Sequence, residues 1–173
     1  MRIAKRSLQR GFTLVELLIV VIILAILAAI VVPQFAASTT DAEDAALQTN
    51  LQNLRSSIEF YRQEHGHWPS GVTSTGAAAC PAGVASGGAV NTEAAFVSAL
   101  TEFTFKDGKA CTGTDGTLFG PYVPEIPPNT KIIAVADQTK VKILSAGVLN
   151  PAADGTTGWV FDNVTGQLLP NNL

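Results

Sequence analysis

The distribution of apolar and polar residues divides the chain near Pro33. Residues 12–32 contain one charged residue, Glu16, and one other polar residue, Thr13. A helix of this length, at about 1.5 Å per residue, spans roughly the 30 Å of a bilayer's hydrocarbon core. From residue 34 onward the chain is polar, acidic and rich in Gly and Ala. The pattern therefore predicts a domain that is anchored in a membrane by its N-terminal segment.

A helical pattern continues beyond Pro33. Apolar residues recur there three and four positions apart, on one face of a helix, at Leu47, Leu51, Leu54, Ile58 and Tyr61. Gly66 and Pro69 then supply the usual signals for the end of a helix. We expect one helix from Phe12 to Glu64, whose second half packs against the rest of its own domain.

The remainder of the chain predicts short elements. Residues 70–91 form a segment rich in Gly and Ala with little intrinsic structure. Asn91 or Thr92 can cap a short helix that carries Phe96, Leu100 and Phe103 on one face. Strand patterns follow at residues 131–136, 140–145, 158–162 and 167–169, with a hairpin turn at 163–166. The sequence thus predicts an α+β fold in which a long N-terminal α-helix packs against a small antiparallel β-sheet.

The positive charges at the N-terminus indicate the topology of the anchor. Four basic residues precede the apolar segment: Arg2, Lys5, Arg6 and Arg10. The rest of the chain carries 7 basic residues (11 − 4) and 14 acidic ones, a balance of −7. Because basic residues beside a membrane span stay in the cytoplasm, the N-terminus is expected inside and the acidic domain outside. Nucleic-acid binding is not expected, because it needs a clustered basic face.

Two cysteines, Cys80 and Cys111, lie in the part that would be exported. In an oxidising compartment such a pair favours a disulfide over a metal site. A bridge that closes a loop of this length would contribute roughly 3–4 kcal/mol to stability.

An ordinary secretory signal is the main alternative for the N-terminus. Residues 36–38 (Ala-Ala-Ser) could supply a small-residue cleavage site. Against this alternative, the apolar segment is too long, Pro33 stands at its end, and Glu16 lies inside it. A carboxylate in hydrocarbon is costly and usually has a partner. The junction before Phe12 therefore requires another explanation.

Residues 10–16, Arg-Gly-Phe-Thr-Leu-Val-Glu, resemble the processing site of type IV pilins and type II secretion pseudopilins. The resemblance implies that a membrane peptidase cuts between Gly11 and Phe12 and methylates the new amine of Phe12. It also implies that Glu16 neutralises the N-terminal amine of a neighbouring subunit. Pro33 falls where the family often has a helix-bending proline. The chain is not expected to be an enzyme, because it shows no catalytic triad or phosphate-binding motif.

The same resemblance implies an organisation, a location and partners. The expected parts are a removed leader (1–11), a membrane and filament-core helix (12–33), an amphipathic helix (34–66), a variable segment with a short helix (67–130) and a sheet (131–173). The subunit would cross the bacterial inner membrane once and then enter a periplasmic or cell-surface homopolymer. Its partners would be the prepilin peptidase, an inner-membrane assembly platform and minor pilins.

Within this family, Gly158-Trp159-Val160-Phe161 and Gly120-Pro121-Tyr122 look most like the major pseudopilins of type II secretion. A major pilin of a surface type IV pilus is the alternative, and a monomeric anchored domain that binds a ligand through residues 70–91 is a further one. Pseudopilins often bind calcium, for which Asp154 and Asp162 are weak candidates, since calcium wants six to eight oxygens. No other cofactor is expected, and His65 and His67 are interpreted as a solvated helix end.

Overall fold

The computed structural model describes residues 11–74, 80, 83–113, 116–145, 147 and 154–172. The chain forms two compact units, Met1–Ala42 and Glu43–Leu173, and each is described by itself. The basic residues of the predicted leader, and most of residues 75–82 in the Gly-rich segment, lie outside the described residues.

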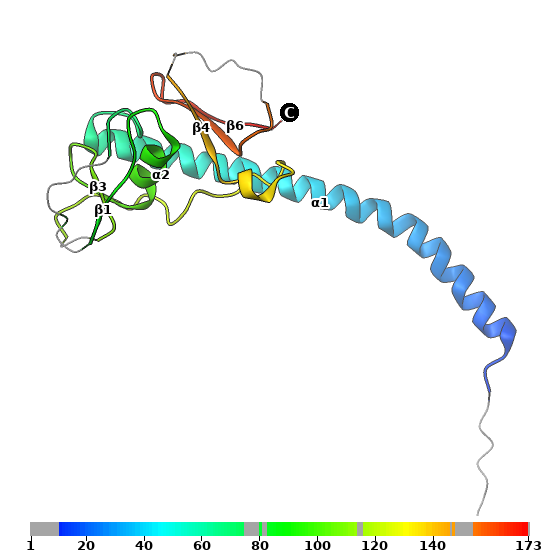
Figure 1. Ribbon diagram of the computed structural model, residues 1–173. Helices are drawn as coiled ribbons and strands as arrows, with labels where there is room; N and C mark the ends of the chain where they lie inside the picture. Colours follow the sequence, from blue (N-terminus) through cyan, green and yellow to red (C-terminus); the bar gives the residue numbers. More distant parts are fainter. Residues whose placement is uncertain are drawn as a thin grey trace, which may run out of the picture. The chain divides into compact units, whose positions relative to one another are not determined.

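The first helix, α1, comprises Leu14–His65 (Figure 1). Pro33 lies within it, although proline removes one backbone donor from the helical hydrogen bonds. The helix ends at Gly66, whose φ of 80° favours glycine and whose N–H donates to the carbonyl of Arg62 at 2.8 Å. The predicted continuous helix and its end are confirmed.

Within the first unit, none of the described residues covers the apolar part of α1. Its most apolar 18-residue window is 0% buried, and this is the one helix among the described residues that is long and apolar enough to cross a membrane. Phe35 near its end is 68% exposed. A surface of this size is stable only in lipid or against another protein.

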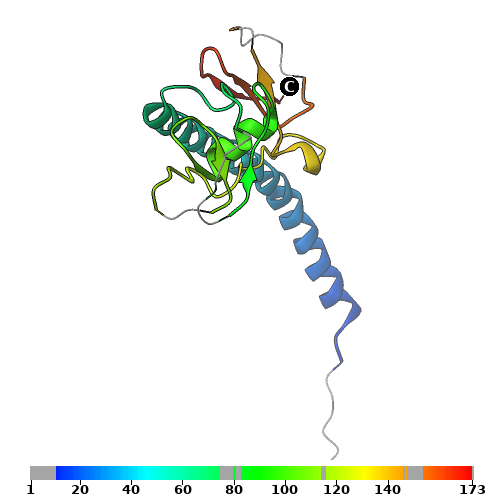
Figure 2. The same ribbon diagram turned by 60° about the vertical axis from the view of Figure 1, so that its left-hand side comes forward.

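In the second unit, the predicted stripe on α1 forms one side of the hydrophobic core. Its five residues are at most 6% exposed, and Leu54 is fully buried. Opposite them pack residues of α2 (Glu93–Thr101) and of the C-terminal strands, namely Phe96, Leu100, Val141, Trp159, Phe161 and Leu168. Figure 2 shows α2 and the strands gathered around this part of α1.

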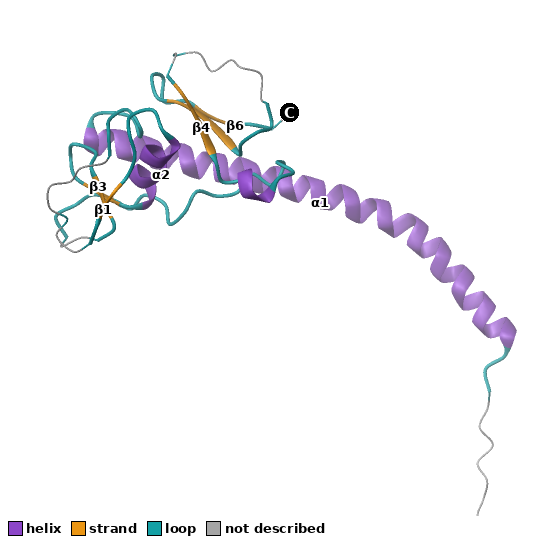
Figure 3. Ribbon diagram, in the orientation of Figure 1, coloured by secondary structure: helices purple, strands orange, loops and turns teal. Residues whose placement is uncertain are grey.

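Two three-stranded sheets complete this unit (Figure 3). The first has the order β1-β3-β2 and joins Ala85–Ser86, Ala110–Cys111 and Phe103–Thr104 in antiparallel pairs. The second has the order β4-β5-β6 and contains Val141–Leu144, Trp159–Asp162 and Leu168–Pro170. The sequence predicted the second sheet but not the first, whose strands of two residues are too short to show a period.

The C-terminal sheet agrees with the predicted α+β fold but differs in one pair. β5 and β6 are antiparallel, with Val160 opposite Leu169, whereas β4 and β5 are parallel, with Val141 opposite Trp159. The connection between β4 and β5, residues 145–158, is long enough to return the chain to the start of β4. The turn at 163–166 joins β5 to β6 as a hairpin, as predicted.

The strand predicted at residues 131–136 is wrong. This segment forms turns and a short 3₁₀ helix, η1 (Val135–Asp137). The backbone N–H of Ile132 donates to the carbonyl of Asn129 at 3.1 Å, and that of Lys131 donates to its side chain at 3.1 Å. Ile133 is 99% exposed, so the alternation of apolar residues does not correspond to a buried face. The polar side chain of Asn129 determines the local structure here.

The short helix α2 begins as predicted. Thr92 is its N-cap, and the Thr92 hydroxyl accepts a hydrogen bond from the N–H of Ala95 at 3.2 Å. Phe96 and Leu100 are fully buried on one face. The helix ends at Thr101, so Phe103 lies in β2 and not on the helical face assigned to it.

Candidate assembly site at the start of α1

Thr13 and Glu16 cap the N-terminal end of α1 through hydrogen bonds to each other. The backbone N–H of Thr13 donates to Glu16 Oε2 at 2.9 Å, and the Thr13 hydroxyl donates to the same oxygen at 2.8 Å. In return, the N–H of Glu16 donates to the Thr13 hydroxyl oxygen at 3.2 Å. This reciprocal arrangement is a capping box, which satisfies backbone donors that the first helical turn leaves without partners.

The capping role of Thr13 was missed in the sequence, although the signal is present. The spacing Thr13-x-x-Glu16 before an apolar segment is the usual signature of a capping box. Glu16 therefore has a partner within its own chain. Both bonds fall on Oε2, and Oε1 has no hydrogen-bond partner among the described residues. One carboxylate oxygen thus remains available to a second group.

The residues on either side of this cap are open to contact. Gly11 is exposed, and Phe12 is 81% exposed. Beyond the cap, Leu14 is 86% exposed and Leu17 is 59% exposed. The site therefore combines an exposed carboxylate with apolar side chains that no described part of this chain covers. Pro33 lies further along the same helix, where it lacks the N–H of an ordinary helical residue.

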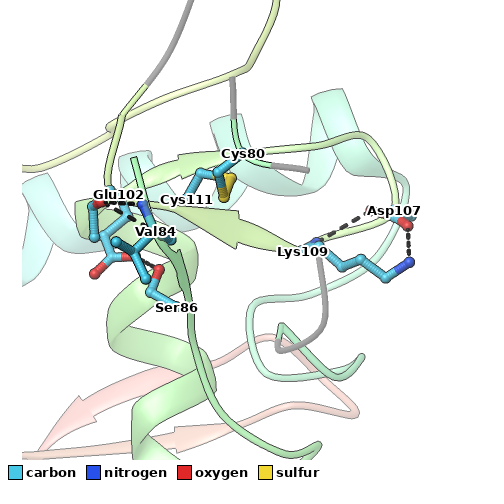
Figure 4. The surroundings of a disulfide bond; sticks show 8 residues. Cys80, Val84, Ser86, Glu102, Asp107, Lys109 and Cys111 are labelled. Atoms are coloured by element: carbon cyan, nitrogen blue, oxygen red, sulfur yellow. Dashed lines mark hydrogen bonds and ion pairs between the residues drawn. A yellow bond between two sulfur atoms is a disulfide. The ribbon is translucent and has the colours of Figure 1, made fainter. Parts of the chain in front are cut away.

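The predicted disulfide between Cys80 and Cys111 is present, with the two Cα atoms 5.7 Å apart (Figure 4). Cys111 is fully buried in β3, where it stands opposite Ala85 of β1 and Phe103 of β2. Nearby, the Ser86 hydroxyl donates to the Glu102 carboxylate, which ties β1 to the end of α2. The bridge thus fastens the Gly-rich segment to the centre of the first sheet.

The two calcium candidates do not form a common site. Asp154 accepts hydrogen bonds from Thr156 and from Asn171 at 2.7 Å, and the Lys142 ammonium lies 2.5 Å from its Oδ2. Asp162 is fully buried and accepts from the N–H of Val164 at 2.9 Å inside the hairpin turn. The two carboxylates accept hydrogen bonds from different donors, and Asp154 already pairs with the Lys142 ammonium. As described, these two residues do not share a calcium site, and their weak candidacy for calcium stays an inference from the sequence alone.

The interpretation of His65 as part of a solvated helix end is wrong. Its side chain is only 7% exposed. Residues distant in the sequence cover it, among them Thr104 and Tyr122, so no local pattern could have revealed its burial. Among the described residues, no group of three His, Cys, Asp or Glu side chains could hold a metal ion.

Comparison with known proteins agrees with the geometry of this site. Residues 6–32, which include the cap, match the family model described as the prokaryotic N-terminal methylation motif. The type IV major pilin PilE1 of Neisseria gonorrhoeae is 37% identical over 78 residues, 45% of this chain and 47% of the relative. A fimbrial protein of Neisseria meningitidis is 40% identical over 72 residues, 42% of each chain. The chain is thus similar to type IV pilins over less than half of its length, and residues 6–32 carry the N-terminal methylation motif.

A type II secretion protein is also among the similar proteins. The type II secretion system core protein G of Klebsiella michiganensis is 32% identical to this pilin-like chain over 66 residues, 38% of the chain and 46% of the relative. In each of these comparisons the chain spans less than half the length of the relative. No solved structure gives a significant match.

Proposed function

We propose that this pilin-like chain is a structural subunit of an extracytoplasmic filament that assembles through α1. The proposal rests on the exposed apolar surface of α1 and on the exposed carboxylate of Glu16 in the first turn of this helix. Before assembly the bilayer surrounds this helix, and afterwards the helices of other subunits do. A heterologous interface that does not close into a ring extends into an open filament.

The junction between Gly11 and Phe12 has a physical purpose in this proposal. A cut there removes four basic residues that would prevent the helix from entering an apolar core. The cut also creates one positive charge, the amine of Phe12. Glu16 Oε1 accepts a hydrogen bond from this amine of a neighbouring subunit, while Oε2 keeps its hydrogen bonds to Thr13. Without its partner, either charge would be buried and uncompensated, which is strongly unfavourable.

The test replaces the carboxylate without changing the apolar surface. Glu16→Gln keeps an oxygen for the cap but removes the charge, and Glu16→Asp keeps the charge on a shorter side chain. We expect Glu16→Gln to be processed normally and to yield far fewer filaments by electron microscopy, with Glu16→Asp intermediate. Normal filaments from Glu16→Gln would refute the charge pairing.

Mass spectrometry of the mature N-terminus distinguishes a filament subunit from a monomeric anchored domain. An N-methylated Phe12 is expected for the subunit. An intact Met1, or a cut after Ser38, would exclude processing at Gly11 and with it the proposed pairing.

Two filament systems are candidates. The C-terminal motifs in the sequence favour a secretion pseudopilin, and the relatives include type II secretion core protein G. The higher identity to the Neisseria pilins, 37% and 40%, favours a surface pilus. Deletion of the gene distinguishes a secretion pseudopilin from a surface pilin. Loss of protein secretion with surface filaments intact identifies the pseudopilin, and loss of surface filaments with secretion intact identifies the pilin.

A further inference from the structure

The C-terminal end of α1 holds an enclosed histidine. The ring of His65 stacks on that of Tyr61 with centroids 4.1 Å apart, and the ring of Phe119 stands edge-on at 5.2 Å. Apolar ring surfaces therefore cover the imidazole. Both of its nitrogens nevertheless have polar neighbours, which come from segments far apart in the sequence.

The partner of Nδ1 fixes the tautomer of the neutral ring. Nδ1 lies 3.3 Å from the carbonyl oxygen of Lys106, which can only accept. Nδ1 therefore carries the hydrogen, and Nε2 of the neutral ring is an acceptor. Nε2 lies 3.0 Å from the Thr104 hydroxyl and 3.1 Å from the Tyr122 hydroxyl. The Tyr122 hydroxyl in turn donates to the carboxylate of Glu64.

The hydrogen bonds of His65 and Tyr122 can be satisfied in two protonation states. With neutral His65, Thr104 donates to Nε2, because the single hydroxyl hydrogen of Tyr122 is used by Glu64. With protonated His65, Nε2–H donates to the Tyr122 oxygen while Tyr122 still donates to Glu64. The hydrogens of His65 and Tyr122 have acceptors in both states, and in the second state the carboxylate balances the imidazolium. Only Thr104 must reorient its hydroxyl.

We propose that His65, Tyr122 and Glu64 form a relay of hydrogen bonds, in which His65 Nε2 takes up one proton as the pH falls while the Tyr122 hydrogen stays with Glu64. In the neutral form Thr104 binds β2 to the end of α1. In the protonated form the stronger link runs from α1 through Tyr122, because a hydrogen bond from a charged donor is stronger than a neutral one. The relay makes the attachment of these two segments to α1 depend on pH.

Other titratable and charged groups lie near the ring. His67 follows on the chain, with ring centroids 5.8 Å apart, and Tyr61 stacks on the ring. On the β2–β3 connection, Asp107 and Lys109 pair with each other at 2.8 Å, and Lys106 contributes its carbonyl. Burial lowers the pKa of His65, the carbonyl of Lys106 and the charge of Glu64 raise it, and the charge of His67 lowers it. Among the described residues, Glu64 is the carboxylate that hydrogen bonds connect to the ring.

The test is a histidine titration by NMR on the full chain in detergent, labelled with ¹⁵N at histidine. The chain has two histidines, so His67→Gln assigns the signals. We expect neutral His65 to carry its hydrogen on Nδ1. We also expect Glu64→Gln to lower the midpoint of its titration by about half a pH unit or more, since a nearby charge shifts pKa by this order.

Glu59→Gln is the matched control, because it removes an exposed carboxylate from the same helix. It should leave the His65 midpoint unchanged. Tyr122→Phe should lower the midpoint as Glu64→Gln does, since it interrupts the relay and leaves the carboxylate in place. A neutral ring with its hydrogen on Nε2, or equal shifts from Glu64→Gln and Glu59→Gln, would overturn the relay.

Discussion

Arg55 on α1 donates two hydrogen bonds to one carbonyl oxygen of β6, that of Leu168, from Nε at 3.1 Å and from Nη2 at 2.8 Å. The side chain of Leu168 points into the core and is fully buried. The helix therefore holds this strand through its side chain on one side and its backbone on the other. The contact joins residues 113 positions apart and fixes the last strand of the sheet to the first helix.

Removal of this guanidinium should loosen the last strand. Arg55→Met keeps the apolar stem but leaves the Leu168 carbonyl without its charged donor. We expect the free energy of unfolding to fall by about 1–2 kcal/mol, as for a hydrogen bond from a charged group at a partly exposed site. Urea unfolding of the full chain in detergent measures the change. Gln52→Met, at an exposed position of the same helix, is the control and should differ little from the parent chain.

The two sides of α1 in the second unit should respond very differently to truncation. Leu54 is fully buried, whereas Phe60 is 61% exposed. Leu54→Ala should lower the free energy of unfolding by about 2–5 kcal/mol, because it leaves a cavity in the core. Phe60→Ala should change it by less than about 0.5 kcal/mol. A large loss of stability from Phe60→Ala in isolated subunits would contradict this orientation of the helix.

The disulfide should contribute to the stability of the whole second unit. Its two cysteines are 31 residues apart, and Cys111 is fully buried. Replacement of both by Ser should lower the free energy of unfolding by roughly 3–4 kcal/mol, because the unfolded chain regains conformational freedom. Reduction of the parent chain should give a similar loss, while the double variant should not respond to reductant. Equal stability with and without the bridge would contradict its structural role.

The capping box should stabilise the first turn of α1 without being required for filament assembly. Thr13→Ala removes the hydroxyl that bonds to Glu16 in both directions, but it leaves the carboxylate in place. Hydrogen exchange of the first-turn amides should accelerate, as the first turn loses a partner. Thr13→Ser keeps the hydroxyl and should exchange like the parent. Filaments should form from both variants, and their absence from Thr13→Ala alone would assign the cap a role in assembly.

The environment of Asp154 predicts a specific sensitivity to acid. The Lys142 ammonium, with donors from Thr156 and Asn171, holds the pKa of this carboxyl well below its ordinary value. The lowered pKa stabilises the folded chain above the ordinary pKa of Asp, about 3.9, and this stabilisation is lost as the pH falls further. Between pH 5 and pH 3, the urea midpoint of Asp154→Asn should fall less than that of the parent. Glu125→Gln, at an exposed carboxylate, should follow the parent.

The elements that the sequence predicted well are those with a local cause. The stripe from Leu47 to Tyr61 repeats at helical spacing, so its burial follows from periodicity alone. Thr92 and Gly66 act within their own turns, as a cap and as a glycine with positive φ. The hairpin at 163–166 is likewise local, because Asp162 bonds to the turn that follows it.

Apart from the cap at Thr13, the features that the sequence did not predict depend on distant residues or on strands too short to show a period. Residues 131–136 alternate like a strand, but they pair with none of the described strands and instead turn about Asn129. His65 is buried by Thr104 and Tyr122, whose positions follow from the tertiary fold. At the assembly site the family motif identified Glu16, whereas the role of Thr13 needed only the three-residue spacing of a capping box.

The hydrogen bonds between Thr13 and Glu16 have a consequence for a subunit that is not in a filament. Under the proposed assembly, a subunit in the bilayer already has a hydrogen-bond partner for its Glu16 carboxylate, because Thr13 in its own first turn bonds to one oxygen. Joining a filament then adds a partner to that acid, and leaving the filament restores the earlier arrangement. Under the proposed assembly, disassembled subunits return to the membrane as a reservoir that can be polymerised again.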